Sequence, residues 1–435
     1  MLETEVVIIG AGVAGLVAAR QLAHAGKQVI VVEARNRTGG RVFTNHDAAF
    51  SQPVELGAEF IHGKLKHTLA LLKEYDITWS KVKGEIWQAQ HGVFTSENDF
   101  IESSKLLNEP LRKLHRDMTV NEFLETLPKD EKHEELKYSV RKFVEGYDAA
   151  DADKASALAF KKEWLEGEEE QYRVDGGYGL LVEALANDCR ACGCRIVLNE
   201  IVKQVNWKKD RVVITTKSEE QFCAPKTLVT IPLGILQLPV SHKNHISFLP
   251  ELPDKMMAVG AMGFGPVIKI ALEFHEPFWK DTDRRSRIQQ NLKKMNFLFT
   301  DTRIPTWWTQ FPDNIPLLTG WIGGPTAKGM QHLSDEQLRD EALNAIVFLF
   351  RVSRDELDKK LKAWQVASWG ADEFAHGAYS YTVVGAANAK KILAEPVDNT
   401  LFFAGESVYS GDETGMVEGA IGSGLETSAA ILRTW

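Results

Sequence analysis

Residues 6–33 read VVIIGAGVAGLVAARQLAHAGKQVIVVE. The β-branched run Val6 to Ile9 predicts a strand that is buried on both faces, and the glycines after it lead into an amphipathic helix that ends near Ala25. A second strand over Lys27 to Val32 then ends at Glu33. This order of strand, glycine turn, helix and strand predicts an α/β fold with a parallel sheet.

The glycine turn has the spacing that cradles a pyrophosphate. Gly10 permits the tight turn, Gly12 lets the backbone approach the phosphates, and Gly15 lets the helix pack closely on the strand. Glu33, about 20 residues on, suits ribose hydroxyls and argues against a 2′-phosphate. A glycine-rich turn by itself does not establish a binding site. Here the two strands, the helix and the terminal acid all agree with the motif, which predicts a Rossmann-like dinucleotide site. NAD and FAD both fit it.

A second glycine pair follows that acid directly, in residues 35–41, which read RNRTGGR. Gly39 and Gly40 would let the chain pass close to a bound cofactor, and the flanking arginines offer bidentate donors to phosphate oxygens. The alternative is a solvated basic turn. Because the pair follows the phosphate cradle so closely, we interpret it as part of the same site.

With these residues the sequence resembles the FAD-dependent amine oxidases, a family that includes monoamine oxidases, polyamine oxidases and lysine demethylases. The resemblance extends through an ordered series of blocks along nearly the whole chain. The blocks are RTGGR at 37–41, VELGAEFIHG at 54–63, DGG at 175–177, LVTIPLG at 228–234, PVIK at 266–269 before FW at 278–279, WG at 369–370 before GAYSY at 377–381, and LFFAGE at 401–406 with GMVEGA at 415–420.

The resemblance implies FAD as the cofactor. It implies a non-covalent site, because Ala378 stands where the monoamine oxidases carry their flavin-linking cysteine. It also implies that Glu406 contacts the ribityl or phosphate region, and that the amides of Met416 and Val417 face the negative edge of reduced flavin. The positions that it assigns to cofactor binding are Gly10, Gly12, Ala14, Gly15, Glu33, Ala34, Arg35, Gly39, Gly40, Arg41, Gly57, Ala58, Glu59, Val202, Trp369, Gly405, Glu406, Gly415, Met416 and Val417.

The resemblance also implies an oxidoreductase reaction. In the family, two electrons, formally a hydride, pass from the carbon next to the amine nitrogen to flavin N5, and water hydrolyses the resulting imine. Dioxygen then reoxidises the flavin and gives hydrogen peroxide. The protein's own task is to orient and desolvate the amine.

Two side chains are expected to act in catalysis. Lys269 lies in the apolar run Val267 to Phe274, where a lysine is costly to bury, and the lysine of this block in the family hydrogen-bonds a water at flavin N5. The alternative is an edge-strand lysine that reaches solvent. Tyr379 stands where the family places an aromatic wall beside the substrate nitrogen, although Tyr381 would take this place in a shifted register.

Other residues are expected to line the substrate pocket. Glu59, Phe60 and His62 fall in a segment near the flavin, where a carboxylate could hold the distal ammonium of a diamine and a histidine could titrate near neutral pH. Glu59 and His62 could equally be supporting, salt-bridged residues. Trp308 is a further lining residue, and Met416 replaces the second aromatic wall of the monoamine oxidases, which softens the pocket.

Length and charge limit the other possibilities. At roughly 150 residues per domain, 435 residues suggest two or three domains, and 44% hydrophobic residues are ordinary for a globular protein. The 51 Lys and Arg against 60 Asp and Glu give a formal net charge of -9, so nucleic acid is not an expected partner. The expected partners are a small amine and O2, for a monomer or homodimer.

The cysteines and the N-terminus indicate the compartment. Cys189, Cys192 and Cys194 crowd together without a matching second ligand pair, which predicts reduced thiols and no metal site. The N-terminus lacks the features of a secretory signal, and the longest nearly apolar run, Val6 to Ala19, is too short to span a bilayer. A soluble, cytoplasmic protein without a membrane partner is therefore expected.

The flavin blocks fall at the start, middle and end of the chain, so the domains are expected to interleave. Residues 1–75, 170–240 and 395–435 would form an FAD-binding domain of the glutathione-reductase type. Residues 76–169 and 241–394 would form a substrate-binding domain with a mixed sheet and helices.

Within the substrate-binding domain, Val267 to Phe274 and Leu317 to Ile322 predict strands. Residues 64–168 have helical apolar spacing and dense charge, which predict solvated helices. The charge runs at 166–170 and 281–285 predict solvated loops or helix ends.

Two other functions remain open from the sequence. An L-amino-acid oxidase would keep the FAD but needs an arginine that clamps the substrate carboxylate, which the sequence does not locate. A catalytically inactive flavoprotein that serves as a binding module is the second alternative, and Lys269 and Tyr379 in their expected blocks count against it.

Overall fold

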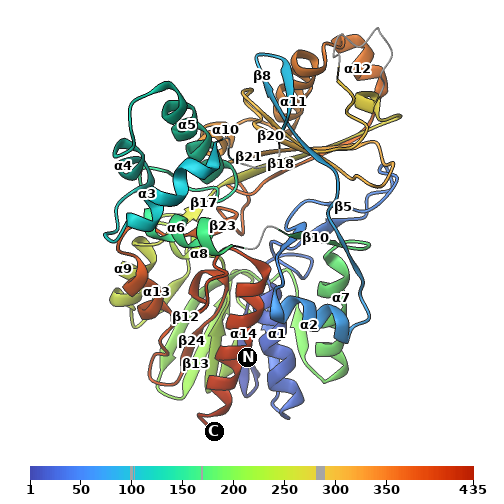
Figure 1. The fold of residues 1–435 in the computed structure, drawn as a ribbon. Coiled ribbons are helices and arrows are strands. Elements are labelled where there is room, and N and C mark those ends of the chain that lie inside the picture. Colours follow the sequence, from blue (N-terminus) through green and yellow to red (C-terminus); the bar gives the residue numbers. More distant parts are fainter. Residues whose placement is uncertain (98–100, 102, 168–169, 281–289) are drawn as a thin grey trace.

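The structure is a computed structural model of the chain, drawn in Figure 1 with its two halves one above the other and both termini at the lower end. Of the charged runs named above, residues 168–169 and 281–285 lie outside its described ranges. No helix among the described residues is long and apolar enough to cross a membrane. The described residues are 1–97, 101, 103–167, 170–280 and 290–435.

The lower half is built on a five-stranded parallel sheet whose strands come from distant parts of the chain. In sheet order the strands are β11 (Arg195–Val197), β3 (Val29–Val32), β2 (Val6–Ile9), β15 (Lys226–Val229) and β24 (Leu401–Phe403). β2 is central and fully buried, as its β-branched run predicted. The parallel α/β sheet expected from the sequence is confirmed.

Different layers cover the two faces of this sheet. The helices on one face are α1 (Val13–His24), α7 (Gly179–Ala191) and α14 (Val417–Leu432). The other face carries a second sheet in the order β1 (Leu2–Glu3), β14 (Gln221–Ala224), β13 (Arg211–Thr216), β12 (Val202–Lys208) and β16 (Ser247–Leu249). Because side chains alternate along a strand, Ile8 packs on the helices and Ile9 on the second sheet. Full burial of such a side chain stabilises the fold by about 1.5–3 kcal/mol.

The upper half contains a seven-stranded mixed sheet, as the sequence predicted. Its order is β22 (Leu361–Ser368), β18 (Val267–Phe274), β21 (Leu317–Gly323), β20 (Thr306–Thr309), β19 (Met295–Thr300), β8 (Glu85–Gln90) and β9 (Val93–Glu97). Only β19 and β8 among these neighbours run parallel. The helices that share its apolar core are α10 (Gly324–Met330), α11 (Asp335–Phe350) and α12 (Arg354–Lys360).

A separate group of helices lies at one side of the upper half. These helices are α3 (Asn108–Lys113), α4 (Val120–Glu125), α5 (Glu131–Gly146) and α6 (Ala157–Glu166). Thr119, Asp130 and Ser156 precede α4, α5 and α6, and each side chain accepts a hydrogen bond from a backbone N–H of the first turn. Helical spacing predicted these elements correctly.

The prediction of helices throughout 64–168 is wrong for residues 79–97, which form strands. After α2 (Lys66–Glu74), the chain forms β7 (Trp79–Lys81) and then the hairpin of β8 and β9. Buried Trp87 and Ala89 alternate with more accessible neighbours in β8, which is the period of a strand. His91 and Gly92 between the two strands have φ values of 50° and 75°, as a tight hairpin turn requires.

The packing also bears on the domain boundaries, which stay a prediction. α9 (Pro253–Gly260) and α13 (Ala387–Ala394) fall in the expected substrate-binding segments, yet they pack on the core of the lower half. The buried Lys255 of α9 donates to the Leu393 carbonyl at 3.1 Å, and to those of Ile392 and Glu395, at the C-terminal end of α13. We therefore propose that these helices, together with β16, belong to the cofactor half.

Candidate functional site

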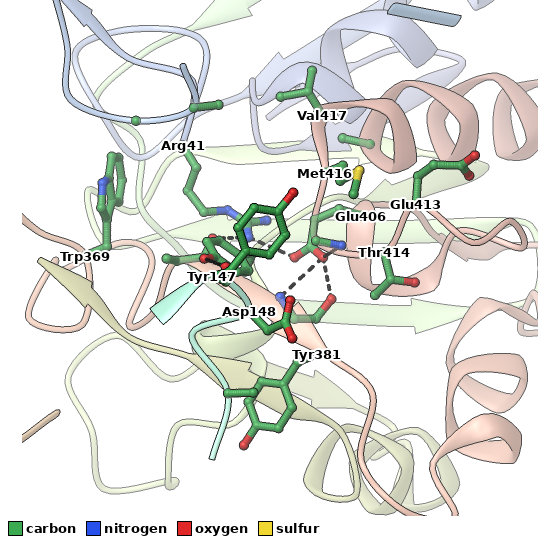
Figure 2. Close-up of a pocket in the computed structure, with 18 of the residues that line it drawn as sticks. Arg41, Tyr147, Asp148, Trp369, Tyr381, Glu406, Glu413, Thr414, Met416 and Val417 are labelled. Atoms are coloured by element: carbon green, nitrogen blue, oxygen red, sulfur yellow. Dashed lines mark hydrogen bonds and ion pairs between the residues drawn. The ribbon is translucent and has the colours of Figure 1, made fainter. Parts of the chain in front are cut away.

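One cavity of about 910 Å³ runs between the two halves, at the upper end of the sizes usual for ligand pockets. Figure 2 shows part of its lining. All the predicted pocket and catalytic residues line it, and so do all the predicted cofactor-binding residues except Gly15. The structure thus brings the predicted site together, while the role of each residue stays a prediction.

The first glycine turn fits a phosphate cradle. A Cβ on Gly15 would lie 2.1 Å from the Gly10 carbonyl oxygen, so Gly15 serves the close packing of α1 and does not line the cavity. A Cβ on Gly12 would meet nothing within 4 Å, because this residue opens onto the cavity. The bare backbone at the start of α1 therefore faces an open space that a pyrophosphate can fill.

The second glycine turn lies directly against the first. The Gly39 N–H donates to the Ala11 carbonyl at 2.8 Å, and a Cβ on Gly40 would lie 3.3 Å from the Gly12 Cα. Gly39 and Gly40 have φ values of 97° and 59°, a region that favours glycine. Two stretches of bare backbone thus form adjoining walls, which fits a dinucleotide and not a small ligand.

Arginines beside the second glycine turn are held by the protein. Arg35 forms a bidentate ion pair with Asp372, with one contact at 3.0 Å. The Arg37 guanidinium lies 3.8 Å from the centre of the Phe43 ring, and burial lowers the pKa of Arg37 to about 10. These contacts exclude an ordinary solvated basic turn.

Glu33 follows β3 and lines the cavity. Its carboxylate accepts the Ala11 N–H at 2.7 Å and the Arg35 N–H at 2.8 Å. Burial raises the pKa of Glu33 from its ordinary value. The two amides fix the carboxylate at the cavity wall, and its contact with a ribose stays a prediction.

Glu406 lies between the end of β24 and the start of α14 in the chain. One oxygen accepts from Arg41 at 2.8 Å, and the other accepts from the Gly415 N–H at 3.0 Å and from the Ser380 hydroxyl. Arg41 also donates to the Ala378 carbonyl at 2.7 Å. Both oxygens of Glu406 are thus engaged by protein donors, so its contact with a cofactor stays a prediction.

The N-terminus of α14 also borders the cavity. The helix begins at Val417 after Met416, and both residues line the cavity. The Met416 N–H bonds the Glu413 carbonyl at 3.3 Å, whereas the first N–H groups of a helix have no partner within it. This end of α14 therefore offers partial positive charge to an anionic ligand group.

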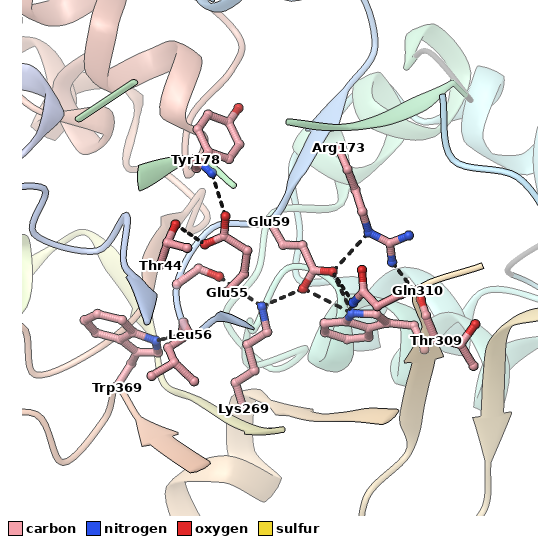
Figure 3. Close-up of polar contacts among 12 residues, drawn as sticks. Thr44, Glu55, Leu56, Glu59, Arg173, Tyr178, Lys269, Thr309, Gln310 and Trp369 are labelled. Atoms are coloured by element: carbon pink, nitrogen blue, oxygen red, sulfur yellow. Dashed lines mark hydrogen bonds and ion pairs between the residues drawn. The ribbon is translucent and has the colours of Figure 1, made fainter. Parts of the chain in front are cut away.

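Lys269 is buried at the cavity wall, with 1% of its surface exposed. β18 lies between β22 and β21, so the alternative of an edge-strand lysine is excluded. The ammonium donates to Glu59 at 2.7 Å and to the Gly57 carbonyl at 3.2 Å (Figure 3). These contacts use two of its three protons.

Glu59 is the centre of a buried polar cluster (Figure 3). Besides Lys269, it accepts from Arg173 at 3.0 Å, from the Trp308 ring N–H at 3.0 and 3.1 Å, and from Gln310 at 3.3 Å. Burial opposes ionisation, but the charges of Lys269 and Arg173 hold the pKa of Glu59 below its ordinary value. Since these partners engage both of its oxygens, the contacts favour the salt-bridged alternative for Glu59 over a contact with a substrate ammonium.

Glu55 is a second, partly buried acid that the sequence did not single out. It accepts from the Tyr178 N–H at 2.6 Å and from the Thr44 hydroxyl at 2.9 Å. Burial raises the pKa of Glu55 to about 7, and Lys269 acts in the opposite direction. No signal in its local sequence marks it.

Aromatic side chains line the cavity around Tyr379, whose role beside a substrate stays a prediction. The Tyr379 hydroxyl donates to the Tyr147 carbonyl at 2.5 Å, and the Tyr379 ring stacks on Trp321 at an angle of 17°. Phe60 meets Trp308 edge to face, with ring centres 5.6 Å apart. Tyr381 lies two residues along β23 (Tyr379–Tyr381) and packs toward the cluster of α3 to α6.

His62 does not titrate near neutral pH. Burial lowers its pKa to about 4, and its Nδ1 lies 2.9 Å from the Tyr147 hydroxyl. The ring is therefore neutral at pH 7. His62 positions Tyr147, a lining residue that sequence reasoning missed.

Two further acids, which the sequence did not single out, also line the cavity. Asp148 follows α5 and Glu163 lies on α6, and both residues line the cavity. Burial and the neighbouring carboxyl raise the pKa of Asp148 well above its ordinary value, and burial raises that of Glu163 to about 7. They fall in a charged helical stretch that looks solvated in sequence.

The cysteine cluster lies away from the cavity. Cys192 is exposed, while the other two cysteines of the cluster are buried against α1. Ligand atoms of His24, Asp188 and Cys192 lie within 4.8 Å of one another. The Asp188 carboxylate already pairs with Arg20 at 2.5 Å, which competes with a cation.

Several known proteins are similar to this chain in amino-acid sequence. The chain is 30% identical to polyamine oxidase 2 of Arabidopsis thaliana, over 97% of this chain and 86% of that one. It is 28% identical to polyamine oxidase 4 of Oryza sativa subsp. japonica, over 97% and 87%. It is also 28% identical to lysine-specific histone demethylase 1 homolog 3 of A. thaliana, of which it spans 30%.

Solved structures show the same fold. Wild-type putrescine oxidase bound to putrescine matches with a TM-score of 0.78 at 20% identity, over 99% of both chains. Cyclohexylamine oxidase from Brevibacterium oxydans IH-35A matches with a TM-score of 0.79 at 20% identity, also over 99% of both chains. Residues 13–432 match the family described as flavin containing amine oxidoreductase. The chain therefore belongs to this family of FAD-dependent amine oxidases.

Proposed function

We propose that this enzyme oxidises a primary or secondary amine at the carbon next to nitrogen, with O2 as the final acceptor and hydrogen peroxide as a product. The family supports an amine oxidase, and polyamine oxidases and putrescine oxidase among the similar proteins favour an aliphatic amine. Bound FAD would supply the two-electron acceptor. The glycine turns, Glu33 and the N-terminus of α14 would hold it, without a covalent link at Ala378.

The observation that carries this proposal is the buried ion pair of Lys269 and Glu59 at the cavity wall. Glu59 orients the ammonium, because Glu59 is itself held by Arg173 and Trp308. With two protons on Glu59 and Gly57, Lys269 has a third to donate to a water in the cavity. We propose that this water serves imine hydrolysis and oxygen activation.

The aromatic lining supports the binding of an amine. Tyr379 is fixed at its hydroxyl by the Tyr147 carbonyl and at its ring by Trp321, so its face is pre-organised. Aromatic faces favour a nitrogen that carries positive charge or a dipole. The same rings exclude water, which lowers the cost of holding the amine in its neutral, reactive form.

An L-amino-acid oxidase is less well supported. The arginines among the described lining residues are Arg35 and Arg41, and each is paired with an acid, Asp372 and Glu406 respectively. Both also lie beside the cofactor turns. Neither is placed as a free clamp for a substrate carboxylate.

Anaerobic mixing tests the proposal. The purified holoenzyme is mixed with a panel of monoamines, diamines, polyamines and L-amino acids, and the visible absorbance of the flavin is followed. Bleaching by amines is the expected result. Bleaching only by L-amino acids would favour the alternative oxidase, and a flavin that no compound reduces would exclude both enzymes.

A further inference from the structure

We propose that His24, Asp188 and Cys192 form a binding site for a divalent metal ion, with Zn²⁺ as the ion that best matches the ligands. None of the three residues lines the cavity between the two halves. The site is therefore separate from the cofactor site, and its existence does not depend on the proposed amine oxidation.

The three side chains come from the ends of two neighbouring helices. His24 is the last residue of α1, Asp188 lies in the last turn of α7, and Cys192 is the residue that caps α7. The two helices share the same apolar core, and Figure 1 shows them next to each other in the lower half. Asp188 and Cys192 are four positions apart, which places them on one face of the helix. The sequence did not indicate this set, because His24 and Asp188 are 164 positions apart.

The distances between the ligand atoms fit a tetrahedral zinc ion. Oδ1 of Asp188 lies 3.1 Å from Nε2 of His24 and 3.6 Å from Sγ of Cys192, and all three atoms lie within 4.8 Å of one another. With the usual bond lengths to zinc, the two matching edges of a tetrahedron are about 3.3 Å and about 3.5 Å. His24 is half exposed and Cys192 is exposed, so the ion can enter from solvent and keep a water as its fourth ligand.

The second oxygen of Asp188 is held by protein donors. Oδ2 accepts from Nε of Arg20 at 2.5 Å and from the Tyr75 hydroxyl at 2.9 Å. Arg20 competes with a cation for the carboxylate at this oxygen, but it leaves Oδ1 facing His24 and Cys192. Hydrogen bonds to the oxygen that does not bind the metal commonly orient a ligating carboxylate.

The ends of three helices provide an independent attraction for a cation. α1 ends at His24, α7 ends at Ala191, and α2 ends at Glu74. Tyr75, which caps α2, bonds Asp188 through its hydroxyl, so the end of α2 also reaches the site. The C-terminal end of a helix carries partial negative charge, which stabilises a nearby cation.

The other two cysteines of the cluster serve a different role. The Cys189 thiol donates to the Leu16 carbonyl at 3.3 Å, and the Cys194 thiol donates to the Ala19 carbonyl at 3.6 Å. Both thiols are buried and point to α1, which leaves Cys192 as the cysteine of the cluster that is open to solvent. Cys192 would bind the metal as a thiolate, and its proton would pass to solvent without any change of oxidation state.

The test titrates the reduced, metal-free holoenzyme with Co²⁺. A Co²⁺ ion bound to a thiolate gives a charge-transfer band in the near ultraviolet, which is read as a difference spectrum against the same holoenzyme without metal. A saturable band with one ion per chain is expected. Zn²⁺ should then remove the band, because it binds such ligands more tightly than Co²⁺ does.

Two variants test the ligands. Cys192→Ser should abolish the band. His24→Gln should weaken Co²⁺ binding about tenfold or more, since even the loss of a group that only orients a ligand has an effect of that size. Both side chains are exposed or half exposed, so both variants should keep the flavin spectrum and the Tm of the wild-type holoenzyme.

His91→Gln is the matched control, because His91 is an exposed histidine whose Nδ1 lies 3.3 Å from a carboxylate oxygen of Asp301. It should leave the band and the affinity unchanged. The proposal would be overturned by the absence of a saturable band in wild type, by an equal band in Cys192→Ser, or by equal affinity in His24→Gln.

Discussion

At the scale of single residues, burial decides what each acid does. Glu59 and Asp148 both line the cavity, but Glu59 has Lys269 and Arg173 as counter-charges while Asp148 has a second acid, Glu163. The first arrangement favours the ionised carboxylate, whereas burial and the neighbouring acid oppose ionisation of Asp148. Chemically similar side chains thus meet opposite electrostatic surroundings in the same cavity.

Lys269→Met tests the lysine. Removing the ammonium leaves Glu59 buried with only Arg173 as a cation, so a loss of about 3–5 kcal/mol in the free energy of unfolding is expected. The rate at which air reoxidises the reduced enzyme should fall about tenfold or more, a modest part of the effect usual for a positioned proton donor. Urea unfolding and stopped-flow absorbance measure the two effects.

The double variant Lys269→Met/Glu59→Gln separates these effects. It removes both charges and should recover much of the stability, but not the rate of reoxidation. Reoxidation of the single variant as fast as wild type would remove Lys269 from the proposed role.

The acids make stability depend on pH in a defined direction. Glu163 and Glu55 have pKa values raised to about 7, above the ordinary 4.5 of an unfolded chain. Their contribution is fully present below pH 4.5 and is lost as the pH rises through 7, since folding then opposes ionisation. Glu163→Gln should therefore raise Tm by a few degrees at pH 8 and leave it unchanged at pH 4.

Scanning calorimetry of the apoprotein at both pH values measures this difference. Equal Tm values of variant and wild type at pH 8 would contradict it. The titratable groups that interact with Glu163 are Asp148, Tyr147 and Tyr379.

At the scale of elements, two glycines at the start of α1 have clearly different roles. Gly15 keeps the helix against the turn, and Gly12 leaves the space for a ligand. Local spacing predicted both roles, because strand, turn and helix are contiguous in sequence. The β8 and β9 hairpin was missed in a segment whose dense charge suggested helices, although its two-residue turn at His91 and Gly92 was a usable signal.

Substituting alanine for each of these two glycines tests their separate roles. Gly12 has a φ of −71°, which alanine adopts freely, so Gly12→Ala should fold normally but bind FAD at least tenfold more weakly. A Cβ at position 15 would strike the Gly10 carbonyl, so Gly15→Ala should lower the Tm of the apoprotein as well. Tm of the apoprotein and FAD titration by fluorescence distinguish them. An unstable Gly12→Ala apoprotein would contradict the assignment.

At the scale of the whole molecule, the cofactor cavity joins segments that lie far apart in the chain. Arg35 and Arg41 reach Asp372 and the Ala378 carbonyl, so the N-terminal turns are fixed to the block that carries Tyr379. A ligand that fills this cavity should stabilise the folded chain as a unit. A cofactor present at 100 times its Kd contributes about 2.7 kcal/mol.

Removal of FAD tests the non-covalent site. Ala378 has no side chain that could form a covalent link, so acid precipitation should leave a colourless pellet and a yellow supernatant. The apoprotein should melt at a lower temperature and recover the holoenzyme's Tm when FAD is added back. Flavin retained by the denatured pellet would contradict a non-covalent site.

The sequence by itself determined the parallel sheet, the phosphate cradle and the family, because these rest on backbone chemistry within short contiguous blocks. Only the tertiary structure decided the electrostatics of the cavity. Glu59 meets Lys269 across 210 positions of sequence, and Tyr147 meets Tyr379 across 232. Whether a carboxylate is a counter-ion, a proton carrier or a surface charge depends on the charges and solvent around it, and folding alone brings those together.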